Sequence, residues 1–72
     1  MMYELRRDFY YTVYKTMTPR CYATKVDHFN SMIELRDFVY RTYRNGYTIE
    51  EVGMNFNILN ENTRIFCVVS II

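Results

Sequence analysis

The chain has 72 residues, of which half are hydrophobic, and it carries nine basic against eight acidic residues for a formal net charge of +1. This length allows one domain with a single core, which is expected to be marginally stable unless heavy side chains or self-association support it. The balanced charge does not favour a general nucleic-acid binder, since such proteins usually have a clear basic excess.

The first predicted element is a β-strand in segment 3–17, clearest between Asp8 and Thr16. Its residues alternate with period two and are rich in aromatic and β-branched types, which favours a strand. Arg7 and Lys15 interrupt the alternation. The pattern therefore indicates a strand with one apolar face and two charged exceptions.

Within this strand, aromatic residues fall on both faces. Successive side chains of a strand point in opposite directions, so Phe9, Tyr11 and Val13 share one face. We expect that face to lie beneath a helix. Tyr10 and Tyr14 then lie on the opposite face, where they form a second aromatic row.

A second strand is predicted over Cys21–Asp27, after a turn that contains the only proline, Pro19. Proline presets a turn and lacks an N–H donor, which suits the connection of a hairpin. In this strand Tyr22 is expected to extend the outer row of Tyr10 and Tyr14.

The strongest local signal predicts a helix over Met32–Arg44. Ser31 and Glu34 have the spacing of a capping box, in which each side chain bonds the backbone amide of the other residue. Apolar residues follow at helical spacing, and Asn45 with Gly46 provides a left-handed end.

After Gly46 the period returns to two. Apolar residues at 52, 54, 56 and 58 alternate with polar ones, which predicts one strand, and segment 60–63 reads as a turn. The last strand, Arg64–Ile72, is apolar on both faces. It is expected to be central and buried on both sides, or else to offer an outer face or free edge to a second copy or a partner.

The order β-β-α-β-β with short links predicts an α+β domain spanning residues 1–72. Its four-stranded antiparallel sheet carries one helix on one face. A single helix covers only part of such a sheet, so the other face must be polar or covered by something else.

Two surfaces are candidates for partner binding. Tyrosine on an exposed sheet offers rigid area and a hydroxyl group, and arginine suits interface contacts. Both surfaces also have an explanation without a partner. The tyrosines would then only cover the sheet, and the helix face would be solvated and carry ion pairs. The candidate residues are Tyr10, Tyr14, Tyr22, Arg36, Tyr40, Arg41 and Arg44.

No sequence pattern indicates a catalytic, metal-binding or cofactor-binding site. Cys21 and Cys67 are far apart and His28 is the only histidine, so neither a disulfide framework nor a zinc site is expected. We expect no cofactor, no metal and no enzymatic activity. The start of the chain lacks the apolar stretch of a signal peptide, and the longest apolar run, residues 65–72, is too short to span a membrane. A cytoplasmic location is expected.

In size and layout, the chain resembles the small phage-encoded proteins that inhibit bacterial machinery, including anti-CRISPR proteins. The features that carry the resemblance are the compact β-β-α-β-β layout, the richness in Tyr and Asn, and the lack of a cofactor motif. It implies function by binding: a folded inhibitor that occludes a site on a host protein or nucleoprotein complex.

Two alternatives from other classes stay open. Tyrosines on a sheet can stack nucleic-acid bases, which would make the chain a small nucleic-acid-binding regulator. An apolar strand with a free edge can also pair with a second copy, which would make it a structural homodimer.

Overall fold

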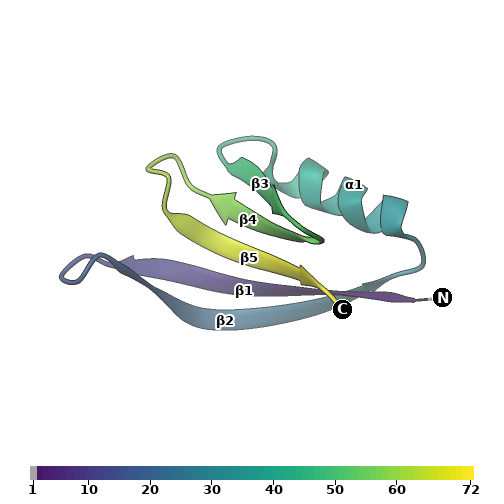
Figure 1. Cartoon of the computed structure of the whole chain (residues 1–72), viewed down its shortest axis with the longest axis horizontal. Helices are drawn as coiled ribbons and strands as arrows, with labels where there is room; N and C mark the ends of the chain where they lie inside the picture. The colour runs from purple at the N-terminus through teal and green to yellow at the C-terminus, as the bar shows by residue number, and fades with distance from the viewer. Residues whose placement is uncertain (1) are drawn as a thin grey trace.

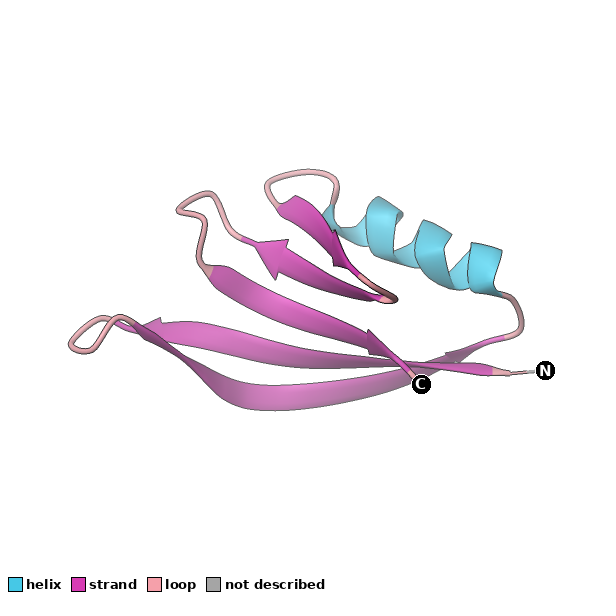
Figure 2. Ribbon diagram, viewed as in Figure 1, coloured by secondary structure: helices cyan, strands magenta, loops and turns pink. Residues whose placement is uncertain are grey.

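The computed structural model describes residues 2–72, which form a five-stranded antiparallel sheet with one helix on one face (Figure 1, Figure 2). Neighbouring strands follow the order β2-β1-β5-β4-β3, so β5 is central as predicted. The α+β class is confirmed, but the predicted count of four strands is wrong. The elements are β1 (Tyr3–Val13), β2 (Thr18–Phe29), α1 (Met32–Tyr43), β3 (Thr48–Val52), β4 (Asn55–Leu59) and β5 (Ile65–Ile71).

The fifth strand arises from a turn within the segment predicted as one strand. Gly53 has φ +61° and begins a two-residue connection between β3 and β4. Such tight hairpin turns often need a positive φ, which glycine adopts at no steric cost. The turn reverses the chain, so Val52 is half exposed while Phe56 is buried, although both belong to the same alternating row in the sequence.

The helix has the predicted start. The Ser31 hydroxyl accepts a hydrogen bond from the Glu34 amide at 3.1 Å. The helix ends at Tyr43, one residue earlier than predicted, and Gly46 follows with φ +85°. The local capping signals therefore located α1 almost to the residue.

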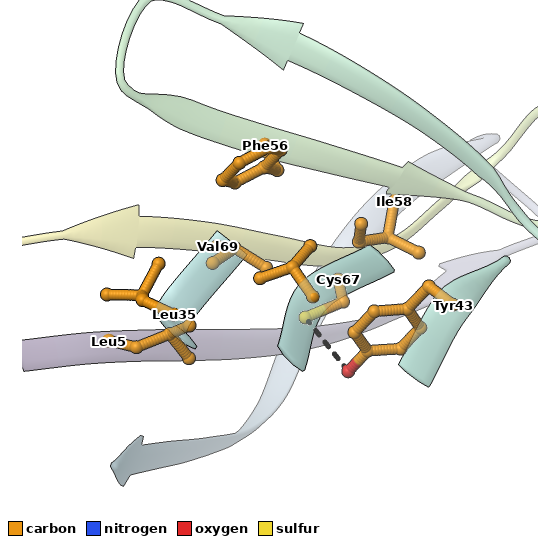
Figure 3. Packing of buried hydrophobic residues seen from close by; sticks show 8 residues of the cluster. Leu5, Leu35, Tyr43, Phe56, Ile58, Cys67 and Val69 are labelled. Carbon is orange, nitrogen blue, oxygen red and sulfur yellow. Dashed lines mark hydrogen bonds between the residues drawn. The ribbon is translucent and has the colours of Figure 1, made fainter. Parts of the chain in front are cut away.

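The core lies between α1 and the centre of the sheet (Figure 3). The helix contributes three buried side chains, which pack against the inward faces of β1, β4 and β5. Because the sheet has only one helix, this core is small, and its buried apolar residues are Leu5, Leu35, Val39, Tyr43, Phe56, Ile58, Cys67 and Val69.

Arg7 lies in this interface and is only 7% exposed. Its guanidinium donates to the Tyr43 hydroxyl and to the Asp27 carboxylate, at 3.1 Å each. The rings of Phe9 and Phe38 lie 5.5 and 5.0 Å from the guanidinium carbon. Burial disfavours the charged form, but the bonds from Tyr43 and Asp27 outweigh it and raise the pKa of Arg7. The residue that interrupts the predicted alternation is therefore a buried, paired cation.

The face of the sheet away from the helix carries polar pairs where residues 4–8 of β1 lie opposite residues 24–28 of β2, next to the part that holds Tyr10. His28 lies 3.3 Å from Glu4, and Arg6 lies 3.3 Å from Asp8. Thr24 donates to Asp8 at 2.6 Å. Water can solvate these groups directly, so this face needs no second layer.

The β1–β2 hairpin extends beyond the rest of the sheet and forms one end of the molecule (Figure 1). The chain measures 44 × 21 × 19 Å, and its radius of gyration is 12.6 Å. A compact domain of this length would have a radius of gyration of about 11 Å. We call the projecting part, residues 10–22, the hairpin arm.

Replacing Asp27 with alanine is expected to lower the free energy of unfolding by about 1–3 kcal/mol, because it leaves the buried Arg7 charge without its carboxylate. Urea unfolding measures this change. Asp37→Ala is the matched control, since Asp37 pairs with Arg41 at 3.4 Å on the exposed helix surface. Its cost should be about 0.5 kcal/mol or less. Equal effects of the two substitutions would contradict the structural role given to Arg7.

Candidate binding site

A cleft of about 690 Å³ opens where the hairpin arm separates from β5. β1 pairs with β2 along its whole length, but it pairs with β5 only from Leu5 to Phe9. Beyond Phe9 the two strands diverge, and the turn before β5 closes the other side. The volume lies in the range of small-ligand and peptide pockets. The cleft is lined by Tyr10, Tyr11, Thr12, Tyr14, Tyr22, Asn60, Ile65 and Phe66.

Two β-bulges shape the wall of this cleft. The register of β1 with β2 shifts after Phe9 and leaves Tyr22 as an extra residue. The register of β4 with β5 shifts after Ile58 and leaves Phe66 as an extra residue. A bulge bends its strand and redirects a side chain. Here both extra residues are aromatic, and both line the cleft.

The redirected rings connect the cleft to the core. Phe9 lies 6.4 Å from Tyr22 and 5.9 Å from Phe66, measured between ring centroids. Phe66 in turn lies 4.8 Å from Tyr47 and 6.4 Å from Tyr43 of the helix. The inner wall of the cleft is thus held by edge and tilted ring packing, while its outer rings stay accessible.

The structure brings the predicted tyrosines together at one cleft, but not as one row on a single face of the sheet. Tyr10, Tyr14 and Tyr22 all line the cleft. Tyr14 belongs to the turn after β1 and is 75% exposed, and the bulge turns Tyr22, which is 59% exposed, toward Phe9. The placement of Tyr11 beneath the helix is wrong: it is 47% exposed, because the arm passes beyond the helix.

The arm is electropositive. Between Phe9 and Val26 the only charged residues are Lys15, Arg20 and Lys25. None of the ion pairs found within residues 2–72 involves these three side chains. They contribute +3 to a total of +1, so the remainder of the chain carries −2. None of the three lines the cleft, but Lys15 and Arg20 belong to the arm that forms one of its walls, so an anionic partner would meet uncompensated positive charge near it.

The four candidate contact residues of the helix region, Arg36, Tyr40, Arg41 and Arg44, fall into two groups. Arg36 and Tyr40 are partly exposed, and both bond Glu51 of β3, at 2.7 and 2.5 Å. The Arg36 guanidinium also lies 5.3 Å from the Phe56 ring centroid. The bond from Tyr40, followed by that from Arg36, lowers the pKa of Glu51. These two candidates therefore connect α1 to β3, and their contact with a partner stays a prediction.

Arg41 and Arg44 stay on the exposed surface of the helix end. Arg41 pairs with Asp37 one turn earlier, and both side chains are largely solvated. Arg44 follows the last helical residue and is exposed. The structure brings neither of them to the arm, so their role in binding stays a prediction that is separate from the cleft.

Several cleft residues were not predicted. Thr12, Ile65 and Phe66 have no local signature, because the bulge at Phe66 and the parting of β1 from β5 depend on how distant strands pair. Asn60 was predicted within a turn, and its side-chain oxygen accepts from the amides of Asn62 and Arg64 at 2.9 and 3.0 Å. Only this turn could have been found from local chemistry.

The cysteines lie apart from each other. Cys21 is exposed on β2, and Cys67 is buried in the core beside Tyr43. Burial raises the pKa of the Cys67 thiol to about 11, so this group stays protonated near neutral pH. Residues 2–72 contain no group of three or more His, Cys, Asp or Glu side chains placed to hold a metal ion. Among the described residues, no helix is long and apolar enough to cross a bilayer.

The cluster of Glu51 with Arg36 and Tyr40, which we call the Glu51 cluster, predicts a pH-dependent contribution to stability. A carboxyl group whose pKa is lowered by folding, from an ordinary value of 4.5, stabilises the fold above that value. This contribution is lost as the pH falls through the lowered pKa. The stability difference between the wild type and Glu51→Gln should therefore be larger at about pH 7 than at about pH 2.5. Thermal unfolding at both pH values measures it, and a difference that does not change with pH would contradict the assignment.

Comparison with known proteins adds no relative: no family model, curated protein or solved structure matches this chain.

Proposed function

We propose that this chain is a non-enzymatic binding protein that holds a protein partner through the aromatic cleft of its hairpin arm. The observation that carries the proposal is one concave surface lined by accessible tyrosine rings, on an arm that also carries the unpaired cations Lys15 and Arg20 outside that lining. Tyrosine and arginine are enriched at the centres of protein interfaces, because they combine large contact area with hydrogen bonding.

The rigidity of the cleft supports this role. Its inner wall is formed by Phe66, which packs on the core aromatic rings, and by Tyr22, which packs on Phe9. A site that is already formed before binding loses little conformational entropy when the partner arrives. The outer rings of Tyr11 and Tyr14 remain free to contact that partner.

We further propose that binding inhibits the partner, as in the small phage-encoded inhibitors that the chain resembles in size and layout. An arm that projects from one end of a 44 Å molecule can enter a recess on a larger protein. The body of the domain would then block access to that recess. The partner is expected to be a bacterial protein or nucleoprotein complex.

A second candidate function is binding of single-stranded nucleic acid by the same arm. The observation that favours it is a run of residues, 10–25, that carries three cations, no carboxylate and several accessible aromatic rings, because single strands are held by base stacking combined with backbone contacts. The homodimer through the sheet stays a prediction, and the polar groups on the uncovered face do not favour stacking of two sheets.

The proposed protein binding predicts that the double variant Tyr14→Ser, Tyr22→Ser loses its partner while keeping its fold. Both side chains are mostly exposed, so their removal should change stability little. The measurement compares proteins retained from bacterial lysates by immobilised wild type and by the variant, with circular dichroism of both. A protein retained by the wild type should be lost from the double variant.

The matched control is Ile33→Ser, which removes an apolar side chain that is 81% exposed on the helix and distant from the arm. This control should retain the same protein as the wild type. Retention by the folded double variant, or retention of nothing by the wild type, would overturn the proposal.

Nucleic-acid binding through the arm predicts a steep dependence on salt. If Lys15, Arg20 and Lys25 each neutralise one phosphate, the logarithm of the binding constant should fall with the logarithm of salt concentration with a slope of about −2. Fluorescence anisotropy with labelled oligothymidylate measures this slope. An absence of binding at low salt would remove the second candidate.

A further inference from the structure

Along the arm, the edge of β1 that faces the cleft has no neighbouring strand. Near the start of β1, Glu4 and Ile72 form a hydrogen-bonded pair, in which the N–H of each residue donates to the C=O of the other, at 3.3 and 2.9 Å. Bonded and non-bonded pairs alternate along an antiparallel ladder, so even-numbered residues of β1 turn their backbone groups toward β5. Thr12 therefore points its N–H and C=O groups into the cleft.

Thr12 has no strand opposite to it. The register of β1 with β5, continued past Phe9, would place Arg64 beside Thr12. Both backbone groups of Arg64 are already used by the turn: its N–H donates to the Asn60 side chain at 3.0 Å, and its C=O accepts from the Asn60 amide at 2.9 Å. The turn that ends the cleft therefore prevents β5 from extending along the arm.

The other edges of the sheet are protected. On β2, Pro19 lies opposite Thr12 and lacks an N–H group, Tyr22 forms a bulge, and Lys25 adds a charge. Prolines, bulges and lysines are the features by which natural sheets prevent edge pairing. β3 has only five residues, two of which are glutamates. The inner edge of β1 is the one that lacks such protection.

We propose that an extended acidic segment of the partner protein binds in the cleft as an added β-strand, hydrogen-bonded to Thr12. This proposal rests on the proposed function and specifies its mode. Strand addition gives affinity through main-chain hydrogen bonds and specificity through pockets for alternate side chains. Here the aromatic rings of Tyr10 on one side and of Tyr11 and Phe66 on the other would receive the alternating side chains.

The charge of the arm selects an acidic segment. Lys15 and Arg20 lie on the arm, Lys25 lies farther along β2 opposite Arg7, and no carboxylate occurs between Phe9 and Val26. A basic segment would be repelled there, whereas carboxylates would pair with cations that have no other ion-pair partner among residues 2–72.

The direct test is hydrogen exchange of the ¹⁵N-labelled full chain, with the capped hexapeptide Glu-Val-Glu-Val-Glu-Val as probe and Lys-Val-Lys-Val-Lys-Val as its charge-reversed control. If a strand is added, the Thr12 amide becomes protected from exchange when the acidic probe binds, and the basic probe has no effect. This measurement needs no variant, so it does not depend on the folding of a mutant.

A pair of variants isolates the backbone donor. Thr12→Pro removes the N–H group, and the extended backbone of Tyr11 suits the residue before a proline. Thr12→Ala removes the same side chain but keeps the amide. We expect Thr12→Pro to weaken binding of the acidic probe about tenfold relative to Thr12→Ala, as measured by NMR titration.

The outcomes separate this proposal from the broader one. Probe binding at the tyrosines without protection of Thr12, and with equal affinities of the two Thr12 variants, would overturn strand addition and leave protein binding by the arm intact. Retention of no protein by the wild type in the lysate comparison, or retention of the same protein by the folded Tyr14→Ser, Tyr22→Ser variant, would overturn both. Protection of Thr12 by oligothymidylate but not by the acidic peptide would overturn the choice of a peptide as the occupant.

Discussion

The arrangement of this small domain depends on one buried cation. Arg7 joins β1 to the helix through Tyr43 and to β2 through Asp27, and its guanidinium lies over the rings of Phe9 and Phe38. In a core with only eight buried apolar residues, this interaction sets how the helix lies across the sheet. Replacing a buried charge by an apolar group can be neutral for stability, but the directional bonds of Arg7 specify one arrangement of three elements. Such specificity matters most where the apolar core is small.

The position of the helix in turn determines where the molecule is accessible. Held by Arg7 at one end and by the Glu51 cluster near β3, α1 covers the centre of the sheet and leaves the hairpin arm uncovered. The side chains of the arm therefore cannot be core residues of this chain. Tyr11, Tyr14 and Tyr22 remain on the surface although their residue types are typical of interiors and interfaces. The same constraint that completes the core also creates the candidate site.

Local signals in the sequence predicted the parts of the fold that local chemistry decides. Ser31 and Gly46 marked the helix, and the two-sided apolar character of segment 65–72 placed the last strand at the centre of the sheet. The turn at Gly53 was not predicted, because the alternation of apolar and polar residues continues across it. The bulges at Tyr22 and Phe66, and the burial of Arg7 against Asp27 twenty residues away, depend on strand pairing between distant segments. For that reason the aromatic residues of the candidate site were largely identified, but their common location was not.

The uneven distribution of charge gives the molecule an electric dipole. Lys15 and Arg20 lie on the arm at one end of the long axis, and Lys25 lies farther along β2 opposite Arg7, while the rest of the chain is negative. In the field of an acidic surface, the molecule would turn before contact so that the arm approaches first and the acidic body points away. The chain could thus orient itself during diffusion although its total charge is close to zero, and the rate of encounter would fall as salt shortens the range of that field.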